Sequence, residues 1–172
     1  MTEVHLANYD PAWRTDFDQE AARLRTVLGA MLLDVHHIGS TAVPGLVAKP
    51  VIDMLAVVSS VHKLDEYQDR LARIGYEGMG EFGIPGRRYF RKHADDGRRT
   101  HHLHAFAVGA AEIERHLDFR DYLRAHPDEA MRYAELKRVL AQRSPDTRAY
   151  TDGKTAFVHE IDRRATAWRQ VA

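Results

Sequence analysis

The stretch HHIGSTAVPGLVAKPVIDMLAVV, residues 36–58, contains the signals that decide the local fold. Residues 35–38 predict a short strand, and residues 41–50 contain a proline–glycine pair that is typical of a turn. Residues 51–58 are apolar on both faces, which predicts a strand buried inside a sheet. One acid, Asp53, interrupts this apolar run. The stretch therefore predicts strand, loop and buried strand, with a carboxylate in an apolar setting.

Asp53 needs a partner in that setting. An ionised carboxylate without one costs several kcal/mol in a buried strand, so Asp53 must meet a cation, a metal ion or hydrogen-bond donors. An ion pair with an arginine would be a structural solution. A ligand-binding site would be a functional one.

The residues that precede this strand favour a binding site. Gly39, Ser40 and Thr41 follow the first predicted strand. A glycine lets a ligand approach the backbone, and small hydroxyls with free amides can cradle a phosphate, although the same residues also form ordinary turns. Lys49 lies at the far end of the loop and could contribute a charge to the phosphates or remain solvated.

The rest of the chain alternates helical and strand patterns. Apolar residues recur at steps of three and four between positions 13 and 31, which predicts an amphipathic helix. The other predicted elements are a helix from 59–60 to about 75, a glycine-rich turn at 78–86, strands at 89–92 and 101–108, a helix at 111–125, a helix that opens at Pro127 and a last helix containing 157–168. This order predicts an α+β fold, residues 1–172 as a single domain, with a mixed β-sheet, flanking helices and a helical C-terminal segment.

Composition restricts the class of protein further. At 172 residues and 44% hydrophobic, the chain suits one domain with a substantial core. The 25 basic and 25 acidic side chains cancel, so charge predicts neither a nucleic acid nor a membrane partner. There is no cysteine, no signal-peptide pattern and no apolar run near the roughly 20 residues that cross a bilayer. We expect a cytoplasmic protein, and oligomeric state stays open.

A histidine pattern occurs in the later strand, His101-His102-Leu103-His104. Strand alternation places His102 and His104 on one face, and His101 on the other. Two imidazoles at this spacing can bind a metal, donate to a phosphate or be satisfied by backbone in a core. If this strand neighbours the strand of Asp53, the three side chains could converge on a divalent metal, with Zn, Mn or Fe suited better than Mg.

A group of arginines and one arginine–aspartate pair complete the candidate residues. Five arginines, Arg87, Arg88, Arg91, Arg98 and Arg99, surround the predicted strands, and one or two could clamp an anion bidentately. Arg120 and Asp121 suggest a structural ion pair within a helix.

The segment Gly153-Lys154-Thr155 looks like the end of a phosphate-binding P-loop. Arg148 stands where the first glycine of that motif should be, so the motif is rejected. Lys154 remains a candidate anion ligand.

Four separated motifs carry a family resemblance. They are HIGSTAVPGLVAKPVID at 37–53, HLH at 102–104, FRDYLRAHP at 119–127 and YTDGK at 150–154. In this order they resemble the GrpB-like family of bacterial proteins over nearly the whole chain. The resemblance implies a nucleotidyltransferase fold of the DNA polymerase-beta kind, in which Gly39-Ser40 would hold nucleotide phosphates. Family members also occur fused to dephospho-CoA kinase, which points to coenzyme or nucleotide metabolism.

The chain departs from that superfamily in two places. The resemblance implies a second acid two residues after Asp53, where Leu55 stands, and a later carboxylate where the chain has His102 and His104. Two-metal catalysis clamps its ions largely through shared carboxylates, so ordinary two-magnesium transfer is not expected.

These observations predict a protein that binds a nucleotide or another phosphorylated small molecule. Gly39, Ser40, Thr41, Lys49, Arg91 and Lys154 are expected at the anion, and Asp53, His102 and His104 at a divalent Mg, Mn or Zn ion. Metal-assisted nucleotidyl or phosphoryl transfer is one expectation. A non-catalytic nucleotide-binding module and a histidine-metal phosphoester hydrolase are the alternatives.

Overall fold

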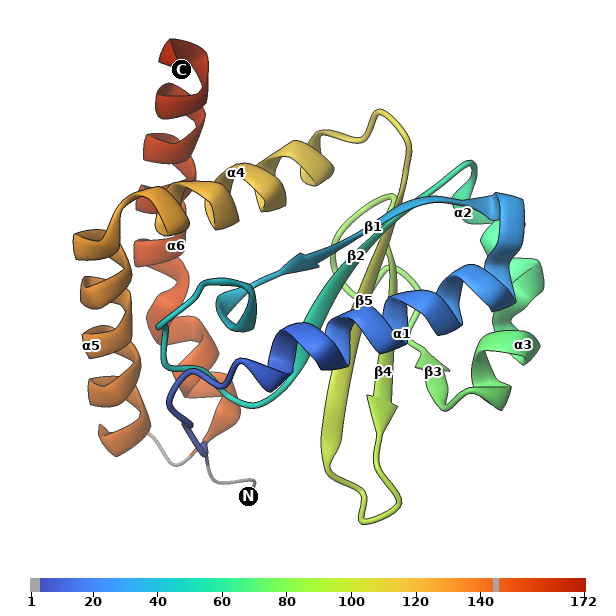
Figure 1. Ribbon diagram of the computed structural model, residues 1–172, viewed down its shortest axis with the longest axis horizontal. Coiled ribbons are helices and arrows are strands. Elements are labelled where there is room, and N and C mark those ends of the chain that lie inside the picture. The colour runs from blue at the N-terminus through green and yellow to red at the C-terminus, as the bar shows by residue number, and fades with distance from the viewer. Residues whose placement is uncertain (1–3, 144–145) are drawn as a thin grey trace.

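A computed structural model describes residues 4–143 and 146–172 of the chain. A five-stranded sheet lies between two sets of helices (Figure 1). One set belongs to the N-terminal half of the chain. The other set consists of the three C-terminal helices, at the side of strand β1. The predicted α+β architecture, with a mixed sheet and a helical C-terminal segment, is confirmed.

The sheet has the strand order β1-β2-β5-β4-β3. Its strands are β1 (Leu32–Ile38), β2 (Ile52–Val58), β3 (Tyr76–Gly78), β4 (Arg88–His93) and β5 (Arg99–Ala107). The pair β2 and β5 is parallel, and the other neighbouring pairs are antiparallel. Because β5 and β2 are neighbours in register, segments almost fifty residues apart in sequence lie side by side at the centre of the sheet.

Helices α1 (Ala12–Leu28), α2 (Val61–Leu64) and α3 (Gln68–Arg73) contribute to the larger hydrophobic core. Asp10 accepts a hydrogen bond from the backbone N–H of Ala12 (2.9 Å) just before α1. The alternate residues of β2 and β5 that pack in this core are Ile52, Met54, Ala56, Val58, Leu103 and Ala105. This arrangement leaves Asp53, His102 and His104 on the other face of the sheet.

The second face meets the C-terminal helices α4 (Ala111–Ala125), α5 (Pro127–Arg143) and α6 (Thr147–Val171). Leu55 and Phe106 of the sheet pack with Ile113 and Leu117 of α4 in a small core. A third core joins the loop between β1 and β2 to these helices, through Val43, Leu46, Tyr133 and Phe157 among others. The loop that carries the candidate phosphate ligands is therefore held between the sheet and α5.

Several predicted boundaries differ from the structure, and two of the differences have a clear physical reason. Strand β1 begins at Leu32 rather than at position 35, because Leu32 pairs with Val58 of β2. The single helix predicted from 59–60 to about 75 is divided into α2, a 3-10 turn (Asp65–Tyr67) and α3, because Tyr67 leaves helical geometry at φ −95° and ψ 2°. None of the helices in the described ranges has the length and apolar character that a membrane crossing requires.

Candidate functional site

Asp53 is the second residue of β2 and is paired in register with His102 of β5. His102 Nδ1 donates to Asp53 Oδ1 over 3.0 Å, and His104 Nε2 lies 3.7 Å from the same oxygen. Burial alone would raise the pKa of Asp53, but the hydrogen bond from His102 and the close approach of His104 outweigh it and hold the pKa well below its usual range. The structure thus brings all three residues together around an ionised carboxylate.

The arginine ion pair considered for Asp53 does not occur among the described residues, where its ion pairs are with the two histidines. A buried ion pair exists instead on the α1 side of the sheet. There the carboxylate of Glu20, 1% exposed, accepts from Lys92 Nζ over 2.8 Å and from the Tyr76 hydroxyl over 2.9 Å. Asp53 is 30% exposed at its side chain, so it can still be reached from solvent.

Gly39 is required by its contact with Asp53. Its φ of +71° lies in the left-handed region, and a Cβ built on it would be 2.7 Å from Asp53 Oδ2. A side chain at this position would therefore both strain the backbone and collide with the carboxylate. The loop backbone and the acid are packed against each other.

Ser40 follows Gly39 and faces α5. The ammonium of Lys137 donates to the Ser40 hydroxyl and, over 3.0 Å, to the carbonyl oxygen of Val47. Lys137 is only 2% exposed, and this burial lowers its pKa well below the ordinary value. A buried lysine thus joins the two ends of the loop.

Lys49 and Lys154 lie near the same place. Their ammonium nitrogens are 5.1 Å and 4.5 Å from the ring centroid of Tyr150, which is 1% exposed. Burial, and to a smaller extent the charge of Lys49, lower the pKa of Lys154 to about 8, while Asp53 opposes the shift. We call Lys49, Lys137 and Lys154 the lysine cradle, because Lys137 interacts electrostatically with the other two and with Asp53.

Other predicted residues lie less directly in this cluster. The Thr41 hydroxyl is buried and already paired with His37 Nε2 at 2.8 Å. Arg91 is paired in register with His102, but its guanidinium lies over the ring of Phe82, 4.6 Å from the centroid. The Arg120–Asp121 pair is confirmed at 2.8 Å.

Sequence reasoning missed Lys137 as a site residue. The available signal was its position four residues after Tyr133, on an apolar face of the predicted helix. A buried cation on an apolar face has to meet acceptors, and that requirement could have drawn attention to Lys137.

The structure also singles out Arg87 from the group of five arginines. Arg87 is buried, at 7% exposed, and its Nη1 lies 3.3 Å from His104 Nδ1.

The donor set does not fit two magnesium ions. Leu55, 0% exposed and packed in the core, occupies the place of the second acid, and Asp53 Oδ1 already accepts from His102. Within the described ranges, no group of three acidic, histidine or cysteine side chains stands in an arrangement that could hold a metal ion. The predicted single metal at Asp53, His102 and His104 stays a prediction.

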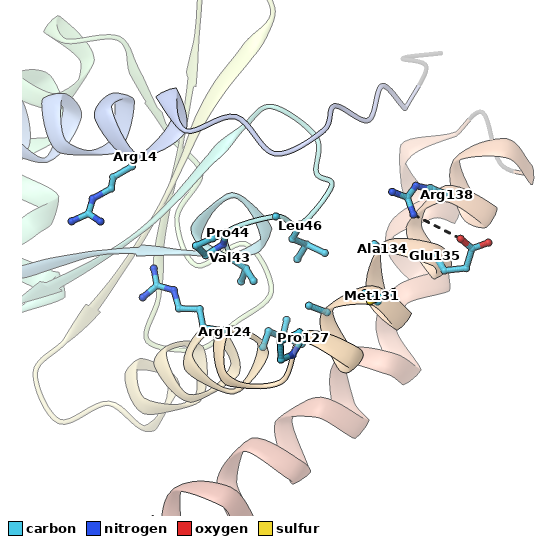
Figure 2. A pocket seen from close by; sticks show the side chains of 13 residues that line it. Arg14, Val43, Pro44, Leu46, Arg124, Pro127, Met131, Ala134, Glu135 and Arg138 are labelled. Carbon is cyan, nitrogen blue, oxygen red and sulfur yellow. Dashed lines mark ion pairs between the residues drawn. The ribbon is translucent and has the colours of Figure 1, made fainter.

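Two cavities accompany the site. The larger, about 820 Å³, is a groove between the loop residues Val43 and Leu46 and a face of α5 that includes Met131. Figure 2 shows its lining side chains, which include Arg124 and the Glu135–Arg138 ion pair of α5. This groove is not lined by Asp53 or by the lysine cradle, so its size does not identify the site.

The smaller cavity, about 550 Å³, lies between α4, α6 and the loop before β4. Lys154 is one of its lining residues, so this cavity adjoins the lysine cradle.

Comparison with known proteins defines the family. The family model "GrpB protein" matches residues 3–164, and the chain belongs to the GrpB family. It is 43% identical over 169 residues to "UPF0157 protein YqkA" of Bacillus subtilis, covering 98% of this chain and 49% of that relative. It is 42% identical to "UPF0157 protein BH1888" of Halalkalibacterium halodurans, covering 95% and 83%. The chain thus spans about half the length of YqkA.

A "Dephospho-CoA kinase" of Mycolicibacterium paratuberculosis is 33% identical over 190 residues, with 96% of this chain and 46% of that protein covered. Among solved structures, the "conserved protein GrpB from Enterococcus faecalis" has a TM-score of 0.89 and 46% identity, over 95% and 99% of the two chains. The chain therefore shares its complete fold with a solved GrpB protein.

Proposed function

We propose that this protein binds the phosphate groups of a nucleotide or another phosphorylated small molecule in the lysine cradle. One observation carries the proposal: buried Lys137 donates to the Ser40 hydroxyl, the half-buried Lys49 and Lys154 lie over the ring of Tyr150, and all three lysines interact electrostatically with Asp53. Buried ammonium groups without matching anions are costly, and a phosphate would supply the missing negative charge. The sequence motifs resemble the GrpB-like family, and the nucleotidyltransferase fold that this resemblance implies supports the same ligand class.

The proposal concerns binding. Leu55 in place of a second acid removes the means of holding two magnesium ions, so no two-metal transfer step is assigned to the chain. Ser40, Gly39 and the lysines would position the anion, and Asp53 would balance part of the lysine charge. The match to part of a dephospho-CoA kinase supports a ligand from nucleotide or coenzyme metabolism.

Calorimetric titration with inorganic triphosphate tests the proposal. Wild-type protein should bind it, and Lys137→Met should weaken binding by about ten- to a hundredfold, the equivalent of one charge-assisted hydrogen bond of about 1.5–3 kcal/mol. Lys63→Met, at an exposed position in α2, is the matched control and should bind as wild type does. Absence of binding to wild type, or equal loss in both variants, would contradict the proposal.

Proton uptake gives an independent readout. A bound phosphate favours the charged form of Lys154, whose pKa without a ligand is about 8. Binding at pH 8 should therefore take up protons, and the apparent binding enthalpy should change between buffers of different ionisation enthalpy. Lys154→Met should reduce that uptake.

A second candidate is a phosphoester hydrolase with one transition metal, suggested by the convergence of Asp53, His102 and His104. To hold the ion, these side chains would have to give up the present His102–Asp53 hydrogen bond and rearrange. We expect such a protein to retain zinc or manganese through purification, and elemental analysis would measure this. His104→Ala should lower the metal content, whereas His93→Ala, at an exposed position, should not. Metal-free wild-type protein that neither binds added metal nor cleaves phosphoesters would contradict this candidate.

A further inference from the structure

The cavity between α4 and α6 offers a place for the part of the ligand that carries no phosphate. Its volume of about 550 Å³ is far larger than one phosphate group needs and falls within the range of small-molecule sites. Ile84 and Val158 supply apolar wall, and Thr155 adds a hydroxyl. Apolar walls with a few polar groups suit a flat heterocycle with a polar edge.

Lys154 connects this cavity to the lysine cradle. It lines the cavity, while its ammonium lies over the Tyr150 ring and interacts with Lys49 and Asp53. A phosphate bound to Lys154 would therefore lie at the wall of this cavity, and the rest of the ligand could extend into it.

The cavity wall carries two carboxylates, Glu112 of α4 and Asp162 of α6, that share one guanidinium. Arg115 donates to Glu112 Oε2 over 2.7 Å and to Asp162 Oδ2 over 3.2 Å, so one guanidinium serves two carboxylates. The other carboxylate oxygen of Asp162 is buried and has no hydrogen-bond partner among the described residues. Burial raises the pKa of Asp162, in keeping with this incomplete satisfaction. A ligand group that brings N–H donors would suit these carboxylates better than one that brings only acceptors.

We infer that the α4–α6 cavity receives the base of a nucleoside phosphate, with the phosphates on the lysine cradle and the N–H-bearing edge toward Glu112 and Asp162. The inference rests on the proposed function and narrows it, because a sugar phosphate has no heterocycle to fill the cavity. Positive charge at one end and surplus carboxylate at the other match the polarity of a nucleotide.

The test compares inorganic triphosphate with the four common ribonucleoside triphosphates by calorimetric titration. Wild type should bind at least one of the nucleotides ten or more times more tightly than triphosphate. Thr155→Trp introduces an indole at the cavity wall from an exposed helix position and should remove this advantage, with triphosphate affinity unchanged. Ala156→Trp is the matched control, because Ala156 is the next exposed residue of α6 and does not line the cavity.

Two outcomes would overturn the inference while leaving the proposed function in place. One is triphosphate binding with no further gain from any nucleotide. The other is a nucleotide advantage that survives Thr155→Trp, which would place the base elsewhere. Failure of wild type to bind triphosphate at all would instead overturn both. Melting temperatures without ligand confirm that each variant is folded before affinities are compared.

Discussion

His102 donates a hydrogen bond to Asp53 over 3.0 Å between two parallel strands that are adjacent in the sheet. The two residues are 49 positions apart in sequence, and the register of β2 with β5 places them directly side by side. This bond explains how an acid persists in an apolar strand. The histidines satisfy one side of the carboxylate, and Gly39 leaves room for the other.

The contact between Gly39 and Asp53 predicts a difference between two glycine substitutions in one loop. Gly39→Ala and Gly45→Ala both place a side chain at positive φ, +71° and +82°, which costs about 1–2 kcal/mol. Only Gly39→Ala also meets a carboxylate, because nothing lies within 4 Å of a Cβ at Gly45. Urea unfolding should show Gly39→Ala to be less stable than Gly45→Ala by about 1 kcal/mol or more. Equal losses would show that the loop moves away from Asp53 at no cost.

The hydrogen-bonded state of Asp53 predicts a pH dependence of stability. Its folded-state pKa is depressed, so its contribution is fully present above the ordinary aspartate pKa and is lost as pH falls below that value. Asp53→Asn should lower the free energy of unfolding at pH 7 by about 1.5–3 kcal/mol, the usual range for a hydrogen bond to a charged group. The difference from wild type should shrink toward pH 3. A difference that is constant over this range would argue against an ionised, histidine-bound Asp53.

His37 predicts a loss of stability as the pH falls, in a pH window above that of Asp53. Burial lowers its pKa to about 4, so the unfolded chain takes up a proton near pH 6.5 that the folded protein resists. The stability of wild type should therefore fall between pH 6.5 and pH 4, by about 3 kcal/mol from His37. His116, whose pKa is also lowered to about 4 by burial, adds a loss of the same sign.

Glutamine at position 37 keeps a polar group near Thr41 but cannot take up this proton. His37→Gln should therefore lose less stability over the same pH window, measured by urea unfolding at several pH values. The exposed His93→Gln variant is the control and should retain the wild-type dependence. A His37→Gln curve parallel to that of wild type would remove His37 as the cause.

Glu20 predicts a stability effect without an effect on ligand binding. Glu20→Gln leaves Lys92 without its buried anionic partner on the α1 side of the sheet, away from the lysine cradle. Removing one member of a buried pair is strongly destabilising, so we expect a loss of about 2 kcal/mol or more in the free energy of unfolding. Triphosphate affinity should stay unchanged, and the exposed Glu66→Gln variant should alter neither quantity. A drop in affinity with Glu20→Gln would link the two faces of the sheet.

Local patterns predicted much of the architecture and part of the site. Alternation in the strand of His102 and His104 placed them together and away from His101, as the structure shows. The apolar run around Asp53 indicated that this acid needs donors. The same reasoning could not show that the hydroxyl of Thr41 is already paired with His37, because nothing local in the sequence records that contact.

Lys137 could not be placed in the same way. It bonds to Ser40 across 97 positions of sequence, and its helix reaches the loop only because the C-terminal helices pack over the second face of the sheet. The charge balance of the site depends on this lysine, and a balance among distant groups is a property of the folded chain.

The order of helices and strands, the burial of the Asp53 strand and the face shared by two histidines follow from the sequence by itself, because periodicity and turn chemistry act between near neighbours. Tertiary structure alone decided that β2 and β5 are adjacent, that Lys137 reaches Ser40 and lies near Lys49 and Lys154, and that a cavity opens beside Lys154. Those features depend on packing between segments far apart in the chain. Their free energies are set by burial and by Coulomb interaction in three dimensions, which no local pattern records.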